Sequence, residues 1–230
     1  MIGIDSMTLC FDNVKVSKTD HYQLIKKSSS KYFIVCPSPY ISWDGLVATF
    51  QNGFLWKIEG SFAKFLLGQN FDGITQAKMP ELTTKLVEYL GVDERCLMNA
   101  RIQNIAFSVT AEVQDNPYKY ITRLKDIQGR RIHSNKPGID RINGQGYSFF
   151  YHNSNWTVCV YDKQAEANYI APPSWEGKNA IRMEITLIKH RKIVQVFHNS
   201  NFIYQDLYED NVWRVFSSLF EETLDKVVSI

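Results

Sequence analysis

Two segments in the second half of the chain alternate strictly between large apolar residues and small or polar ones. Residues 156–161 read Trp-Thr-Val-Cys-Val-Tyr, and residues 180–187 read Ala-Ile-Arg-Met-Glu-Ile-Thr-Leu. Successive side chains of a β-strand point to opposite faces, so this period of two predicts two strands that each bury one face. The chain therefore has to build a sheet with a covered apolar face around these two segments.

The other periodic segments complete an α+β pattern. Asn52-Gly53 predicts a two-residue hairpin turn. Strands outnumber helices and several are joined by hairpins, which predicts a central, largely antiparallel sheet covered by helices. With 230 residues, 44% of them hydrophobic, we expect a single domain over residues 1–230. The further strands are predicted at residues 1–11, 32–36, 46–50, 54–58, 101–109 and 147–152, and the helices at residues 62–67, 81–90, 118–127 and 203–230.

Composition and cysteine spacing narrow the class of protein. The sequence has no run of 18 apolar residues and its first residues lack the pattern of an export signal, so we expect no membrane partner. Cys10, Cys36, Cys96 and Cys159 match neither a zinc pattern nor a small secreted framework. We therefore expect reduced thiols in a cytoplasm. The net charge of +2 does not decide between classes of partner.

One segment, between Gln128 and Gln145, is basic and punctuated by glycines. Arg130, Arg131, Lys136 and Arg141 lie in it together with His133. Such a run is ordinarily a solvated loop. The alternative is a clamp on the phosphates of a nucleic acid, because clustered cations neutralise phosphate charge.

Tyr161 stands at the end of a predicted buried strand, and Lys163 falls on the same face if the extended geometry continues two residues further. A phenol titrates near pH 10, so it needs a neighbouring cation or metal to react as phenolate at neutral pH. The pair is consistent with a nucleophile beside a cation. It is equally consistent with a half-buried strand tyrosine whose hydroxyl finds a hydrogen-bond partner.

Other candidates also have two interpretations. Glu184 is either a metal ligand or the partner of Arg182 in a strand salt bridge, and His152 is either a ligand or general acid or a solvated residue beside a turn. Aromatic residues in strands are either core or platforms for unpaired bases. The aromatic candidates are Trp56, Tyr147, Trp156 and Trp175.

Four segments, in order, resemble the filamentous-phage gene II replication initiators and, more distantly, the rolling-circle plasmid initiators. They span roughly residues 55–190. Residues 58–70, followed by Gly73, are similar to an apolar segment that runs into Gly-His-Asn in the family. Residues 101–108 resemble Arg-Ile-Asp before a strand, and residues 158–163 resemble the segment with the DNA-linking tyrosine two residues before a lysine. Residues 181–185 resemble an Arg-x-Glu strand.

The resemblance implies an HUH-endonuclease-like fold and an enzyme that nicks and rejoins one DNA strand at a replication origin through a 5′-phosphotyrosine. Tyr161 would be the nucleophile, Lys163 would offset charge on the phosphate or the phenolate, and Glu184 would bind Mg²⁺ or Mn²⁺. The implied partners are single-stranded or supercoiled origin DNA and a host helicase, in the cytoplasm of a bacterial host.

The sequence departs from the family at two implied metal ligands. Gln69 stands where the family has histidine, and Asn104 or Gln103 stands where it has the aspartate of Arg-Ile-Asp. Asn104 is favoured because it shares the polar strand face with Ala106 and Ser108. Amide oxygens carry no formal charge and bind a hard cation more weakly than carboxylates. The carboxylates that could compensate are Glu59, Asp162 and Glu166.

Three hypotheses follow. The first is the nicking-joining enzyme. The second is a non-catalytic module that binds origin DNA or single-stranded DNA on the same fold. The third is an unrelated α+β interaction protein.

Overall fold

The computed structural model describes residues 1–15, 24–28, 31–34, 46–51, 54–124, 138–142, 146–166 and 171–227. These residues form one ten-stranded sheet in which every neighbouring pair is antiparallel, in the order β2-β3-β4-β5-β1-β6-β10-β9-β8-β7. The predicted fold class is thereby confirmed. The strands are β1 (Ile2–Val14), β2 (Leu24–Ser28), β3 (Lys31–Ile34), β4 (Val47–Gln51), β5 (Phe54–Ser61), β6 (Arg101–Val113), β7 (Gly138–Ile142), β8 (Gly146–His152), β9 (Trp156–Asp162) and β10 (Asn179–Leu187).

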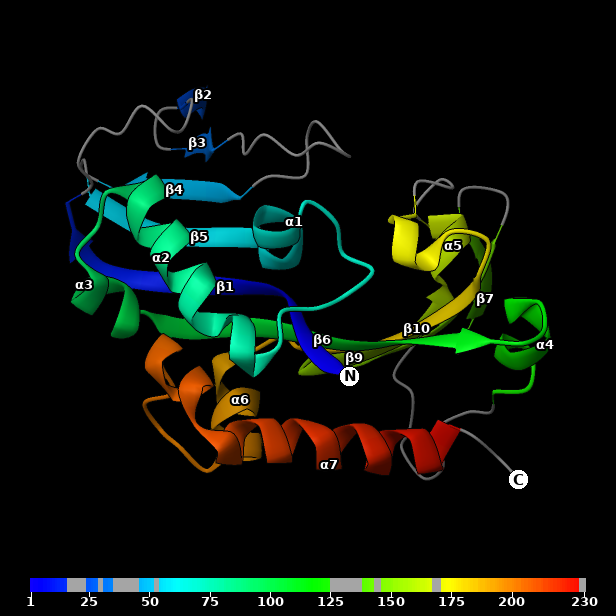
Figure 1. The fold of residues 1–230 in the computed structure, drawn as a ribbon. Helices are drawn as coiled ribbons and strands as arrows, with labels where there is room; N and C mark the ends of the chain where they lie inside the picture. Colours follow the sequence, from blue (N-terminus) through cyan, green and yellow to red (C-terminus); the bar gives the residue numbers. More distant parts are fainter. Residues whose placement is uncertain are drawn as a thin grey trace.

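Helices cover the sheet, and short 3-10 turns lie at Gln76–Lys78, Pro173–Trp175 and Tyr204–Tyr208. In Figure 1, α6 and α7 run beneath the sheet, whereas α5 lies above its right-hand end. The helices are α1 (Phe62–Leu67), α2 (Met79–Leu90), α3 (Glu94–Met98), α4 (Pro117–Ile121), α5 (Lys163–Glu166), α6 (His190–Phe197) and α7 (Asp210–Val227).

The apolar face of the central strands packs against α7. Phe107 of β6 contacts two rings of that helix, with centroid distances of 4.2 Å to Phe216 and 5.4 Å to Phe220. Val158 and Ile185, from the two alternating segments, are fully buried on this face. Burial of these side chains removes apolar surface from water and fixes which way the strands face. The polar alternates of β9 and β10 therefore point to the side away from α7.

Several elements differ from the sequence-based expectation. The helix expected at residues 118–127 is α4, which ends at Ile121, and α3 has no predicted counterpart. Residues 138–142 of the expected basic loop form β7. The extended geometry after Tyr161 ends at Asp162, directly before α5 begins at Lys163. The C-terminal helix begins at Asp210 rather than at residue 203, after a 3-10 turn. Arg130, Arg131 and Lys136 lie outside the described residues, and Arg141 lies in β7, of which only the backbone is described.

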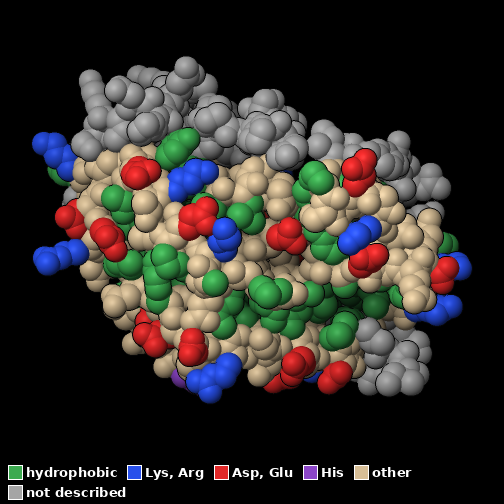
Figure 2. Space-filling model, in the orientation of Figure 1, with side chains coloured by type: hydrophobic (Ala, Val, Ile, Leu, Met, Phe, Trp, Pro, Cys, Tyr) green, Lys and Arg blue, Asp and Glu red, His purple; other side chains and the backbone are tan. Residues whose placement is uncertain are grey.

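No helix within the described ranges is long and apolar enough to cross a membrane. On the face drawn in Figure 2, acidic and basic side chains are interspersed wherever side chains are coloured. This view of the described residues therefore offers no large patch of one sign to a charged partner.

Candidate active site

Tyr161 and Glu184 meet on the side of the sheet that faces away from α7. Their strands β9 and β10 are neighbours, with Tyr161 paired to Arg182 and Cys159 paired to Glu184. The Tyr161 hydroxyl donates a hydrogen bond to Glu184 Oε1 at 2.5 Å. Only 6% of Tyr161 is exposed, and 20% of the Glu184 side chain is exposed. The carboxylate is thus the more accessible member of the pair.

Arg182 joins that pair to a second carboxylate. Its side chain is fully buried; Nε donates to Glu184 Oε1 at 2.7 Å, and Nη2 lies 3.0 Å from Asp5 Oδ1. Asp5 belongs to β1, whose pairing with β6 shifts by one residue between Ile4 and Ser6. Such a β-bulge leaves one residue without a directly opposite partner and re-aims its side chain. The bulge therefore brings a second acid to the buried guanidinium.

Lys163 lies over Tyr161 because the chain turns sharply after β9. Asp162 Oδ1 accepts hydrogen bonds from the backbone N–H groups of Gln164 and Ala165 at 3.1 and 3.0 Å, which starts the short helix α5. Lys163 is completely buried, and its Nζ lies 5.7 Å from the centroid of the Tyr161 ring. The predicted pair of tyrosine and lysine is therefore brought together, through a turn rather than through an extended strand.

Residues 69–73, here named the strap, cover this cluster. Lys163 Nζ donates to Asn70 Oδ1 at 2.9 Å and to Glu166 Oε2 at 2.6 Å, which ties the strap to α5. The backbone carbonyls of Asn70 and Phe71 accept from Arg182 Nη1. Thr110 Oγ1 of β6 donates to the Phe71 carbonyl at 2.6 Å. Side chains from three elements thus hold the strap over the site.

Glycines and a short bridge fix the two ends of the strap. Gly68 adopts φ of 71°, a left-handed conformation that ends α1. At the other end, Ile4 and Ile74 exchange two backbone hydrogen bonds of 2.8 Å, and Gly3 packs directly against Gly73. A Cβ added at Gly73 would lie 2.6 Å from the carbonyl carbon of Gly3. Only residues without side chains allow the strap to lie this close to β1.

Burial shifts the pKa values of the ionisable groups in this cluster. It raises the pKa of Tyr161 well above the ordinary value, and the nearby Glu184 carboxylate raises it further. Burial lowers the pKa of Lys163, with Arg182 adding to the effect and Glu166 opposing it. Burial also raises the pKa of Asp5, although Arg182 opposes that shift. With the strap in place, Tyr161 is therefore a neutral phenol hydrogen-bonded to a carboxylate.

The three predicted metal ligands do not converge on one point. Gln69 Oε1 accepts hydrogen bonds from the backbone N–H groups of Phe71 and Asp72, within its own loop. Asn104 shares a face of β6 with Ser108, the residue paired to Glu184, but lies four residues further along the strand. That separation is about 13 Å at the rise of a strand. Glu184 is the one predicted ligand among the three at the cluster.

The carboxylates that could compensate already have other partners. Glu59 pairs with Lys57 at 2.8 Å, Asp162 caps α5 and Glu166 holds Lys163. Within the described parts of the chain, no three His, Cys, Asp or Glu side chains are grouped so that they could hold a metal ion. The residues that the structure describes therefore do not assemble a site for the divalent ion that the resemblance implies.

Two residues of the cluster were not among the candidates derived from the sequence. Asp5 is an acid within a segment predicted to be a buried strand, and Asn70 follows directly after Gln69. A buried acid requires a partner, so an acid inside a predicted buried strand could have marked Asp5 as a candidate site residue. Its partner Arg182 could not be read from the sequence, since the bulge that joins them depends on strand register.

The aromatic candidates have different surroundings. Trp156 is buried, Trp56 is 46% exposed on β5, and Trp175 packs against Phe71 of the strap at 6.0 Å between centroids. Trp175 Nε1 also donates to Asp72 Oδ1 at 3.3 Å. The Tyr147 side chain lies outside the described residues.

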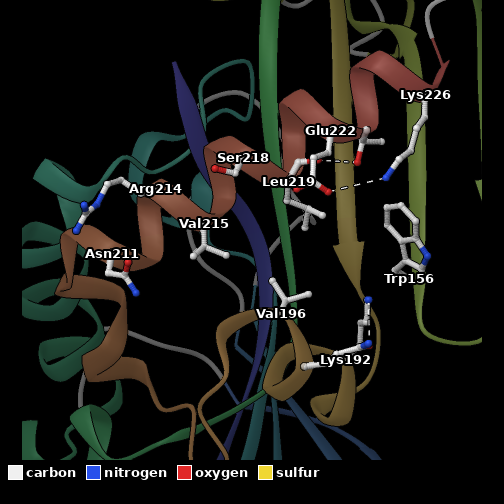
Figure 3. A pocket seen from close by; sticks show the side chains of 12 residues that line it. Trp156, Lys192, Val196, Asn211, Arg214, Val215, Ser218, Leu219, Glu222 and Lys226 are labelled. Atoms are coloured by element: carbon white, nitrogen blue, oxygen red, sulfur yellow. Dashed lines mark hydrogen bonds and ion pairs between the residues drawn. The ribbon is translucent and has the colours of Figure 1, made fainter.

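A separate groove of about 460 Å³ lies between α6 and α7, away from this cluster. Figure 3 shows Lys192, Lys226 and Trp156 around one end of it, and Arg214 and Asn211 toward the other. Glu222 Oε2 lies 3.9 Å from Lys226 Nζ. None of the predicted catalytic or metal-binding residues lines this groove.

No protein-family model matches the sequence, and a search of curated proteins finds none that matches. Among solved structures, the fold is similar to that of a rolling circle replication initiator protein from Geobacillus stearothermophilus. The TM-score is 0.52 at 16% sequence identity, and the match covers 98% of this chain and 84% of that one. The similarity confirms the predicted α+β fold, a largely antiparallel sheet covered by helices.

Proposed function

We propose that the protein is a rolling-circle replication initiator that nicks and rejoins one DNA strand at an origin, with Tyr161 as nucleophile. The observation that carries the proposal is the 2.5 Å hydrogen bond from the Tyr161 hydroxyl to Glu184, beside the buried cations Lys163 and Arg182. A positioned nucleophile with an adjacent base and nearby positive charge is the arrangement that phosphoryl transfer requires.

The reaction runs in two reversible halves. Tyr161 Oη attacks the phosphorus while Glu184 takes the phenol proton, and the bond from phosphorus to the 3′ oxygen breaks. Glu184 then gives this proton to the released 3′ oxygen, and the 5′ phosphate stays on the tyrosine. Rejoining reverses each step, as the 3′ hydroxyl displaces the tyrosine. Lys163 and Arg182 offset the charge that develops on the phosphate oxygens.

Access to the phenol requires the strap to move, because Tyr161 is 6% exposed. Moving it also releases Lys163 from Asn70, which frees one Nζ hydrogen for a phosphate oxygen. The expected Mg²⁺ or Mn²⁺ has no assembled ligand set among the described residues.

We further propose that Arg130, Arg131, Lys136 and Arg141 bind the DNA backbone, since they concentrate positive charge within a short segment. The partner would be single-stranded or supercoiled origin DNA in a bacterial cytoplasm, with a host helicase as a further partner.

A second candidate function is binding of origin or single-stranded DNA without nicking. It is favoured by the burial that raises the pKa of Tyr161 and by the dispersed ligand set. Both candidates share the fold and the basic segment, and they differ in whether a covalent adduct forms.

The deciding experiment incubates the protein with supercoiled origin plasmid in Mg²⁺, in Mn²⁺ and in EDTA. The enzyme predicts nicked or relaxed circles and a protein–DNA adduct that is absent in Tyr161→Phe. The binding module predicts a salt-sensitive gel shift without cleavage. An adduct that persists in Tyr161→Phe would exclude Tyr161 as the nucleophile.

A further inference from the structure

Beside Tyr161, the sheet carries an aromatic pair that no part of the proposed chemistry uses. Phe150 and His152 of β8 have ring planes within 13° of parallel and centroids 6.1 Å apart. We propose that this pair is the stacking site for an unpaired base of the DNA strand that leads to Tyr161. The inference rests on the proposed DNA-binding function and names its substrate subsite.

The strand register places this pair on the same face as the candidate active site. Phe150 is paired to Cys159, and Cys159 to Glu184, so these three residues form one row across β8, β9 and β10. Two strand spacings separate the ends of the row, about 10 Å between backbones. The next row contains His152 and Thr157. The aromatic pair therefore lies on the sheet surface that adjoins Glu184.

At Phe150 this surface is more exposed than the opposite one. Phe150 is 39% exposed, whereas its neighbours Phe149 and Tyr151, which point to the other face of β8, are 3% and 2% exposed. A core role would place Phe150 among buried side chains. Phe150 is exposed and His152 beside it is half-buried, and a base of any sequence can stack on an exposed aromatic face.

A cation is fixed at the end of the sheet beyond His152, at the β8–β9 turn. Arg191, exposed at the start of α6, donates from Nε and Nη2 to Asn155 Oδ1 at 3.1 and 2.8 Å. Asn155 lies in the turn between β8 and β9, three residues after His152. The guanidinium is thus held at the β8–β9 turn, at the end of the sheet rather than on the face of the aromatic pair. A strand that continues past His152 over this end would bring a phosphate to it. Single-strand sites combine stacking rings with cations that follow the backbone.

The dimensions suit a short single strand. The row of Tyr161 and the row of His152 lie four residues apart along β9, which is about 13 Å. At the 3.4 Å rise of a DNA strand this distance corresponds to roughly four nucleotides. A base stacked on the aromatic pair would therefore lie within a few nucleotides of the phosphate presented to Tyr161. Duplex DNA cannot use the site, because its bases are stacked on each other.

The test measures binding of fluorescein-labelled oligo-dT, and of a duplex of equal length, by anisotropy over a range of salt. Phe150→Ala should weaken binding of the single strand about tenfold without changing its salt dependence. Arg191→Gln should reduce the slope of log affinity against log salt by about 1. Tyr118→Ala, at an aromatic residue 45% exposed on α4, is the matched control and should bind as the unaltered protein does.

Crosslinking identifies the contact directly. Irradiation of the complex with oligo-dT that carries 5-iododeoxyuridine should attach the base to the peptide with Phe150 and His152. Unchanged affinity in Phe150→Ala, or no binding of oligo-dT by the unaltered protein, would overturn the inference. Loss of binding in Phe150→Ala without any tyrosine adduct in the plasmid assay would support the subsite and reject nicking. If instead the unaltered protein forms the tyrosine adduct and Phe150→Ala binds oligo-dT with unchanged affinity, nicking would be supported and the stacking subsite rejected.

Discussion

The hydroxyl of Tyr161 and the side chain of Arg182 donate to the same oxygen, Oε1 of Glu184, at 2.5 and 2.7 Å. One carboxylate oxygen therefore holds both the proposed nucleophile and the buried cation. Removing the negative charge of Glu184 affects proton acceptance and the pairing of Arg182 at once, whereas Asp5 continues to pair with Arg182 at 3.0 Å. The two acids thus have separable roles.

Glu184→Gln should slow formation of the tyrosine adduct by about 10²- to 10⁴-fold, because an amide cannot accept the phenol proton. The measurement is a single-turnover rate with labelled origin DNA. Glu112→Gln, which removes an exposed acid paired with Lys178 at 3.1 Å, is the control and should react at the normal rate. A rate in Glu184→Gln within threefold of normal would show that Glu184 is not the base.

Lys163→Met should abolish most adduct formation yet leave the free energy of unfolding at pH 7 unchanged or higher. Burial lowers the pKa of Lys163, which means that its charged form is costly in the folded protein despite its contact with Glu166. Replacing it with an apolar side chain of similar length removes that cost. Urea unfolding measures the effect, and destabilisation by more than about 1 kcal/mol would contradict it.

The same shift predicts a difference in pH dependence between the two proteins. The pKa of Lys163 is lower in the folded protein than its ordinary value of 10.5. At pH values above 10.5 the side chain is neutral in both states, so its burial costs no charge. As the pH falls through the folded-state pKa, Lys163 becomes charged while buried, and this stability is lost. The stability of the unaltered protein should therefore decline relative to Lys163→Met as pH falls from above 10.5 toward neutrality. Lys178→Met, at an exposed residue, should show no comparable relative decline.

Alternation predicted the strands well because one face of each is covered. Val158 and Ile185 are buried against α7, and Tyr161 and Glu184 share the other face, as their spacing indicated. The sequence also placed Lys163 beside Tyr161, although α5 rather than an extended strand brings it there. The four-residue helix α5, which follows the Asp162 cap, is too short to show a helical period in the sequence.

The rest of the site depends on register and on contacts distant in sequence. Asp5 contacts Arg182 because of a β-bulge in β1. Such a one-residue shift in strand pairing does not appear in the pattern of apolar and polar residues, so the sequence does not predict it. Its place on the polar face of the strand favoured Asn104 as a metal ligand, but the pairing of β6 with β10 puts Ser108 beside Glu184 instead. Ser108 is 1% exposed and its hydroxyl has no hydrogen-bond partner among the described residues.

Reversing the charge of Arg130 and Arg131 to Glu should weaken DNA binding without unfolding the protein. The loss should be largest at low salt, and the salt dependence should become shallower by about one unit for each phosphate contact removed. Gel shifts over a salt series measure it, and circular dichroism monitors the fold. Lys119→Glu, at a residue 58% exposed on α4, provides the matched charge reversal. Equal affinity for both variants would argue against the assignment.

Gly73→Ala should destabilise the protein and loosen the strap. The new Cβ would lie 2.6 Å from the backbone of Gly3, which is not a flexible side chain that can move aside. Overpacking of this kind costs about 1–3 kcal/mol, and for a chain of this size each kcal/mol lowers Tm by about 2–4 °C. Hydrogen exchange should rise at residues 69–74, because the Ile4–Ile74 hydrogen bonds depend on the same close approach.

Gly177→Ala separates this steric effect from backbone strain. Gly177 has φ of 71° and no atom within 4 Å of an added Cβ, so alanine there meets only the penalty of the left-handed conformation. It should lower Tm modestly and leave exchange at residues 69–74 unchanged. If Gly73→Ala behaves in the same way, contact between Gly3 and Gly73 does not hold the strap. Faster adduct formation in Gly73→Ala, despite its lower Tm, would indicate that the strap limits access to Tyr161.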